Sequence, residues 1–291
     1  MNYDMPVYRP PSEASSLILQ VTLGCSHNGC TFCGMYKGKQ FHIKSWQEIK
    51  TEIETCGRQP YGINRVFLAD GDALAVDTGT LLKTLNLLYK TFPNLERVGI
   101  YAGPKDIHAK SKDELVELGK AGLKIFYLGI ESGSDKILKA VNKGVNSEQM
   151  IKAGKKIMDS GLQLSATIIL GLGGKELWQE HARETAAVVS AVNPTYLGAL
   201  TLMVVPDTPL YKKVQRGDFE VPNSSEILKE IKLLLANVNL SNCTFRSNHA
   251  SNYLPLRGIL NQDRDKLVKL IENALEQPDK VPLRPEYFRG L

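Results

Sequence analysis

The sequence predicts an α/β protein, a partial (β/α)6 barrel of the TIM type with a C-terminal helical and loop extension. Two observations lead to this fold class. Short apolar runs typical of buried strands alternate along the chain with segments of helical periodicity, which favours a parallel sheet. Glycine or polar clusters follow these strands at their C-terminal ends, where barrel enzymes build their active sites. A length of 291 residues is sufficient for one such domain.

The six predicted strands are apolar runs bounded by polar residues, glycine or proline. They cover residues 16–22, 65–69, 97–101, 124–130, 164–170 and 195–205. Pro206 ends the last of them, because proline cannot donate to a sheet. Each strand is followed by a helical pattern or by a loop rich in polar residues, as a barrel requires.

The helices are recognised by apolar spacing and by their end signals. Ser45 and Glu48 form a capping box at the start of the first helix, in which Trp46, Ile49 and Ile53 recur at helical spacing. Gly161 is a C-cap signal. Helices are expected at 45–55, 80–92, from Ser111, at 147–160, after 171–174, at 224–238 and at 263–275. The last two flank a polar segment, 242–258.

We expect residues 1–215 to form the core barrel and residues 216–291 to form an extension that packs on it and could close the substrate site. The net charge of +5 permits an acidic partner but does not indicate nucleic acid. No apolar run reaches the ~18 residues of a membrane span. Five cysteines and an N-terminus without an apolar signal segment predict a cytoplasmic protein.

Three cysteines, Cys25, Cys30 and Cys33, lie within nine residues directly after the first strand. Three thiolates on one loop can hold three irons of a 4Fe–4S cluster and leave one iron open for a ligand. A zinc site is the alternative, and His27 or Cys56 would have to supply its fourth ligand. A disulfide framework is disfavoured in a chain of this length with five cysteines.

Four motifs occur in barrel order: the cysteine loop, Gly71-Asp72, the segment 129–135 and the segment 171–176. This series resembles the radical S-adenosylmethionine (SAM) superfamily, and most of all the branch with anaerobic coproporphyrinogen oxidase and the methylthiotransferases. The similarity extends from about residue 16 to residue 211. The chain departs from the family's usual C-x3-C-x2-C spacing, because four residues, 26–29, separate its first two cysteines.

The resemblance implies a 4Fe–4S cluster on Cys25, Cys30 and Cys33, whose open iron is chelated by the amino and carboxylate groups of SAM. The remaining contacts to SAM are carried over position by position. They are Phe32, Asp70, Gly71, Asp72, Glu131, Ser132, Ile169, Gly171 and Leu172. Phe32, Ile169, Gly171 and Leu172 would contact the adenine, and the turn at 70–72 would receive the amino group.

The implied activity is reductive cleavage of SAM to a 5′-deoxyadenosyl radical, which abstracts a hydrogen atom from an unidentified small-molecule or peptide substrate. A reduced flavodoxin- or ferredoxin-type protein would supply the electron under anaerobic conditions. One alternative is a radical SAM methyl- or sulfur-transferase, and another is a non-catalytic iron–sulfur or zinc protein. The basic residues Lys37, Lys39 and Lys44 form either a solvated loop or a docking surface for an acidic electron donor or for substrate phosphate.

The polar segment after the barrel is the candidate substrate region. Its candidate residues are Arg246, Asn248, His249, Asn252 and Arg257. The alternative is a polar loop whose groups are satisfied within the protein. Cys243 could donate a hydrogen atom to a radical, although a small buried thiol is the commoner case, and Cys56 is expected to be structural.

Overall fold

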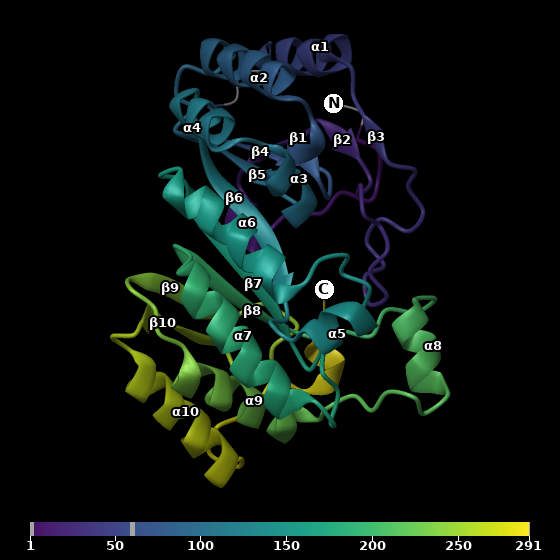
Figure 1. Cartoon of the computed structure of the whole chain (residues 1–291), viewed down its shortest axis with the longest axis vertical. Helices are drawn as coiled ribbons and strands as arrows, with labels where there is room; N and C mark the ends of the chain where they lie inside the picture. The colour runs from purple at the N-terminus through teal and green to yellow at the C-terminus, as the bar shows by residue number, and fades with distance from the viewer. Residues whose placement is uncertain (1–2, 59–61, 291) are drawn as a thin grey trace. The chain divides into compact units, whose positions relative to one another are not determined.

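The computed structural model describes residues 3–58 and 62–290 (Figure 1). The chain divides into two compact units. The first contains residues 1–28, 35–128 and 156–164, and the second contains 29–34, 129–155 and 165–291. The cysteine loop is therefore shared between them, with Cys25 in the first unit and Cys30 and Cys33 in the second.

The first unit contains parallel strands in the order β1 (Leu17–Gln20), β4 (Arg65–Ala69), β5 (Arg97–Tyr101) and β6 (Leu123–Glu131), of which β6 runs on into the second unit. Leu19, Phe67 and Ile100 of these strands are completely buried, as the apolar runs predict. A separate antiparallel pair, β2 (Thr22–Leu23) and β3 (His42–Ile43), precedes the first helix.

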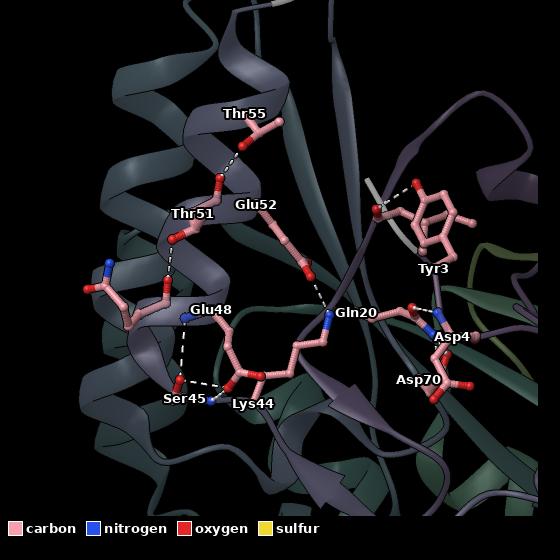
Figure 2. Close-up of polar contacts among 12 residues, drawn as sticks. Tyr3, Asp4, Gln20, Lys44, Ser45, Glu48, Thr51, Glu52, Thr55 and Asp70 are labelled. Atoms are coloured by element: carbon pink, nitrogen blue, oxygen red, sulfur yellow. Dashed lines mark hydrogen bonds and ion pairs between the residues drawn. The ribbon is translucent and has the colours of Figure 1, made fainter.

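The helices of this unit are α1 (Trp46–Gly57), α2 (Thr78–Thr91), α3 (Pro104–Ala109) and α4 (Lys112–Lys120). The predicted capping box is confirmed: the Glu48 N–H donates to Ser45 Oγ at 3.3 Å, and the Ser45 N–H donates to the Glu48 carboxylate at 2.7 Å (Figure 2). Lys44 forms an ion pair of 2.6 Å with Glu52 of α1 in the same view.

The second unit contains β7 (Gln163–Leu170), β8 (Tyr196–Thr201), β9 (Cys243–Ser247) and β10 (Leu256–Leu260), in this order. The first three are parallel, and β10 is antiparallel to β9. At the outer strand, the Ile259 N–H donates to Asp263 Oδ2 at 2.8 Å. The segment predicted as a polar region thus contains a two-stranded hairpin.

The helices of the second unit are α5 (Asp135–Ala140), α6 (Ser147–Asp159, whose last turn belongs to the first unit), α7 (Trp178–Val192), α8 (Pro209–Gln215), α9 (Ser224–Asn237) and α10 (Arg264–Glu276). Helices α7 and α10 both pack against α9, and the three lie together beside the strands (Figure 1). Gly258 of β10 faces α10, because a Cβ there would lie 3.2 Å from Leu267 Cδ1.

The alternation of strands and helices confirms the α/β class predicted from the sequence. Helices α9 and α10 lie within one residue of their predicted bounds. Among the residues that the structure describes, no helix is long and apolar enough to cross a membrane.

Candidate functional site

The start of the cysteine loop lies against the turn that follows β4. The Gly71 N–H donates to the Gly24 carbonyl at 3.0 Å, and the Gly24 N–H donates to Asp70 Oδ2 at 3.2 Å. A Cβ at Gly71 would lie 2.6 Å from the Tyr36 ring and 3.0 Å from the Cβ of Cys25. Glycine is therefore required at position 71 for the loop to approach this turn so closely.

The Asp70 carboxylate is completely buried and its contacts are all within the first unit. Besides Gly24 it accepts hydrogen bonds from Gln20 Nε2 at 3.1 Å, and it pairs with Lys39 Nζ at 3.1 Å. Gln20 also exchanges two hydrogen bonds of 3.0 Å with the backbone of Asp4 (Figure 2). The Asp70 side chain thus holds the loop, and the Asp70 N–H donates to the Thr22 carbonyl at 3.1 Å.

The basic residues after the last cysteine do not form the exposed cluster that a docking surface needs. The side chains of Lys39 and Lys44 are only 7% and 9% exposed, and each is paired with a carboxylate. The Lys37 Nζ donates to the Asn28 carbonyl at 2.5 Å. Two of the three charges are therefore used inside the first unit.

Asp72 is a nearly buried carboxyl group that also holds the cysteine loop. Its Oδ2 accepts from Ser26 Oγ at 2.5 Å, and its Oδ1 accepts from the Gly103 N–H at 2.8 Å. Burial, together with the neighbouring carboxyl group of Asp106, raises the pKa of Asp72 to about 8. The Asp72 carboxyl group therefore keeps its proton to a higher pH than an exposed aspartic acid does, and it connects the residue after Cys25 to the end of β5.

In the second unit, residues 29–34 are held by α5 and by the start of α8. The Thr31 N–H donates to the Val141 carbonyl at 2.9 Å, and the Leu210 N–H donates to the Thr31 carbonyl at 3.0 Å. Asn142 Nδ2 donates to the Gly29 carbonyl at 3.0 Å. These bonds fix the backbone on either side of Cys30.

Three of the residues implied to contact adenine share one apolar cluster in the second unit. Leu172 is buried in it, and Phe32 and Ile169 pack against it half-buried. The other members include Ile137, Val141, Leu202 and Leu210. The structure thus brings Phe32 together with Ile169 and Leu172, from which it is more than 130 residues away in the sequence, in an apolar cluster suited to a flat ring.

Glu131 and Ser132 lie at the end of β6 and take up different roles. The backbone of Glu131 has a positive φ of 64°, and its carboxylate pairs with Lys143 Nζ at 2.9 Å. Ser132 is completely buried, and its Oγ accepts from the Ser134 N–H at 3.1 Å. A Cβ at Gly129 would lie 2.1 Å from the Glu131 carboxylate, so a larger residue there would displace that carboxylate.

A buried pair that the sequence did not point to connects two of these motifs. Glu230 of α9 and His181 of α7 are both completely buried, and Glu230 Oε1 lies 2.8 Å from His181 Nδ1. The Gly171 N–H donates to Glu230 at 2.9 Å, and His181 Nε2 lies 3.3 Å from the Glu131 carbonyl. Both ring nitrogens of His181 thus face acceptors, and the pair joins the ends of β6 and β7.

The candidate substrate residues fall into two groups. Asn252 is buried and bound to β8, because it accepts from Thr201 Oγ1 and donates to the Ala199 carbonyl, both at 2.9 Å. His249 is half-buried and lies 3.0 Å from Ser251 Oγ, and burial lowers its pKa. By contrast Arg246, Asn248 and Arg257 are exposed.

Cys243 lies in the core of the second unit. Its thiol is completely buried, and burial raises its pKa to about 12. It shares a face of β9 with Phe245, which is opposite Gly258 and therefore on the side of α10. Cys56, at the end of α1, is half-buried in the first unit.

The chemistry of the cysteine donors fits an iron–sulfur cluster. Cys25, Cys30 and Cys33 are half-buried, so their sulfur atoms are near the surface of their units. Soft thiolates are the ligands that such clusters take. Within residues 3–58 and 62–290, no three His, Cys, Asp or Glu side chains are gathered closely enough to hold a metal ion. The fit therefore depends on donor type and on the hydrogen bonds that hold each part of the loop.

Comparisons with known proteins agree with this donor chemistry. The family model described as Radical SAM superfamily matches residues 19–186, more than half of the chain. An uncharacterized protein of Methanocaldococcus jannaschii is 24% identical over 287 residues, which are 94% of this chain and 79% of its own. The ribosomal protein uS12 methylthiotransferase RimO of Thermotoga sp. (strain RQ2) is 26% identical over 236 residues, 77% of this chain. The chain spans 52% of that longer protein.

Two solved structures show the same fold. Methylornithine synthase (PylB) aligns with 92% of this chain and 83% of its own, at a TM-score of 0.53 and 17% identity. Coproporphyrinogen III oxidase (HemN) from Escherichia coli aligns with 76% of this chain and 52% of its own, at a TM-score of 0.56 and 17% identity. These likenesses confirm the predicted α/β fold of the TIM-barrel type.

Proposed function

Because the chain belongs to the radical SAM superfamily, whose members use a 4Fe–4S cluster and S-adenosylmethionine, we propose that it is an enzyme that cleaves SAM reductively. The family match confirms the resemblance and the cofactors expected from the sequence. The observation that carries the proposal is the three-cysteine loop inside the matched residues 19–186. When bound, the cluster and SAM supply a one-electron cleavage that yields methionine and a 5′-deoxyadenosyl radical.

The residues of the first unit would supply the first cysteine that binds the cluster, and they would contact the amino group of SAM. Cys25 is the first ligand, and its neighbours Gly24 and Ser26 are fixed by Asp70 and Asp72. Gly71 allows the loop to lie against the turn at 70–72, which would receive the amino group of SAM. Because burial raises its pKa, Asp72 would add less negative charge near the thiolates than an exposed aspartate does.

The residues of the second unit would supply the other two cysteines that bind the cluster, and they would contact the nucleoside part of SAM. Cys30 and Cys33 flank Thr31 and Phe32, which the backbone bonds to α5 and α8 keep in place. Phe32, Ile169 and Leu172 would pack on the adenine and exclude water from it. Gly171 would also contact the adenine, and Glu131 and Ser132 would contact the ribose or the methionine part.

We further propose that the product radical abstracts a hydrogen atom from a small-molecule or peptide substrate. A reduced flavodoxin- or ferredoxin-type protein would supply the electron, and the net charge of +5 permits such an acidic partner. The second candidate is transfer of a methyl or sulfur group, which the name of the RimO relative supports. Methyl transfer from a second SAM would release S-adenosylhomocysteine in addition to 5′-deoxyadenosine and methionine, so the appearance of S-adenosylhomocysteine would indicate methyl transfer, and a gain of sulfur by the substrate would indicate sulfur transfer.

The test is anaerobic reconstitution with iron and sulfide, reduction with dithionite, addition of SAM, and mass spectrometry for 5′-deoxyadenosine and methionine. We expect both products from the wild-type protein and none from Cys30→Ala, since the cluster would lose one of its three ligands. Iron and acid-labile sulfide should reach about four each per chain in the wild-type protein.

Cys56→Ala is the matched control, because Cys56 is also half-buried but lies outside the loop. It should retain the iron content and the cleavage activity of the wild type. Full cleavage activity in Cys30→Ala would exclude the proposed ligand set. One zinc per chain in place of iron would contradict the proposed reaction.

A further inference from the structure

The hairpin of β9 and β10 places two arginines directly opposite each other. Arg246 of β9 pairs in register with Arg257 of β10, and both side chains are exposed. Directly opposite residues of an antiparallel pair have Cβ atoms about 4.5–5.5 Å apart. The register continues across the sheet, because Arg246 is beside Gly198 of β8 and Gly198 is beside Thr167 of β7.

This row lies on the face of the strands opposite the helices. Phe245 and Gly258 are register partners, and Gly258 approaches Leu267 of α10. Side chains alternate between the two faces of a strand, so Arg246 and Arg257 point away from α10. In a (β/α) barrel the helices cover the outside, and the opposite face of the strands lines the interior.

The two guanidinium groups lack a counter-charge from the protein. Within the described part of the chain, the arginines that form ion pairs are Arg97, Arg216 and Arg289. The positions of β7–β10 that share the face of Arg246 and Arg257 in the second unit are apolar, glycine or hydroxyl-bearing, and none is acidic. Like charges directly opposite each other destabilise a sheet. A bound anion would offset this cost.

The position beside this pair would accept one more carbon atom at ordinary van der Waals distances. A Cβ at Gly198 would meet nothing closer than 3.8 Å, and Thr167 Oγ1 would lie 3.9 Å from it. An anion held by Arg246 could therefore extend over Gly198 toward the Thr167 hydroxyl. Ile169, implied to contact adenine, is two residues further along β7, about 7 Å away at the rise of a strand.

We propose that Arg246 and Arg257 bind the anionic group, a carboxylate or a phosphate, of the substrate. This inference deepens the proposed function and rests on it, because it names the chemical class of the molecule that the radical attacks. Guanidinium groups form bidentate hydrogen bonds with carboxylates and with phosphates, and the Thr167 hydroxyl can donate a further hydrogen bond. A substrate so held would lie on the face where Ile169 is implied to contact adenine.

The experiment measures binding of inorganic phosphate and of succinate by calorimetry, at constant ionic strength, to the reconstituted protein. The variants are Arg246→Gln, Arg257→Gln and, as the matched control, Arg216→Gln, an exposed arginine on α8's C-terminal end that pairs with Asp218. We expect the first two to weaken anion binding about tenfold or more, since each loses a charged hydrogen bond. The control should bind as the wild type does.

The relative affinities for phosphate and succinate distinguish the two possible classes of substrate. Tighter binding of phosphate assigns a phosphate-bearing substrate, and tighter binding of succinate assigns a carboxylate-bearing one. Equal affinity in all four proteins, or no binding by the wild type, would overturn the proposal. Urea unfolding without anion checks the fold, because both arginine variants should be at least as stable as the wild type. Cleavage of SAM by the wild type, measured in parallel, tests the proposed function separately.

Discussion

Replacing Glu230 by alanine tests whether the buried pair with His181 holds the second half of the candidate SAM site. The wild-type carboxylate accepts from the Gly171 N–H at 2.9 Å and lies 2.8 Å from His181 Nδ1, with both side chains completely buried. Alanine would leave the Gly171 N–H and the imidazole without their acceptor. Breaking a buried pair by removing one partner costs about 3–5 kcal/mol. We expect the free energy of unfolding to fall by that amount.

The assay is urea unfolding of the wild type and of Glu230→Ala, together with SAM binding measured in the absence of urea. Glu272→Ala is the matched control, because its ion pair with Lys232 is 2.7 Å long but the two side chains are 40% and 39% exposed. Such a surface pair contributes about 0–1 kcal/mol. SAM should bind more weakly to Glu230→Ala alone, because Gly171 loses its anchor. Equal unfolding free energies for the two variants would refute the reasoning.

Two further predictions concern the first unit. Gly71→Ala should lower the free energy of unfolding by about 1–3 kcal/mol and reduce the iron content, because the added Cβ would lie 2.6 Å from the Tyr36 ring. Gly38→Ala is the control, because a Cβ at Gly38 would have no atom within 4 Å. It should match the wild type in urea unfolding and iron analysis. For Asp72, whose folded pKa is raised to about 8 from 3.8, the folded state binds more protons than the unfolded state between those values, so stability should fall as pH rises through this window. Asp72→Asn should remove that part of the slope in unfolding experiments between pH 4 and pH 8, and an unchanged slope would contradict it.

The strands of the first unit could be predicted because their signals are local. Residues 65–69 and 97–101 are apolar runs bounded by polar residues, and β4 and β5 coincide with them residue for residue. Helix α2 begins at Thr78, two residues before the predicted start, because the Asp77 side chain caps it by accepting from the Thr80 N–H at 2.9 Å.

The shortest elements were missed. Helices α3 and α5 have six residues each, too few for a helical period to be visible, although Pro104 at the first position of α3 and Ser134 before α5 are start signals. The strands β9 and β10 were read as a polar segment, because only Cys243 and Phe245 mark the buried face of β9.

The partners of site residues could not be predicted, because they depend on contacts between distant segments. His181 and Glu230 are 49 residues apart, and each looks like one polar residue on an amphipathic helix. The raised pKa of Asp72 depends on Asp106 of α3, a helix that the sequence did not indicate. The alternation of buried and exposed side chains along β9 likewise depends on its register with β8 and β10.

The contact between Asp263 and Ile259 has a consequence for how the molecule behaves at high concentration. Strand β10 is the last in the order of its sheet, and the row of N–H and C=O groups at such an edge can template pairing with another chain. The Asp263 carboxylate occupies the outward donor of Ile259, and the exposed charge of Arg257 lies two residues away. Together they oppose the addition of a foreign strand, so the hairpin can offer its open face to a ligand without self-association.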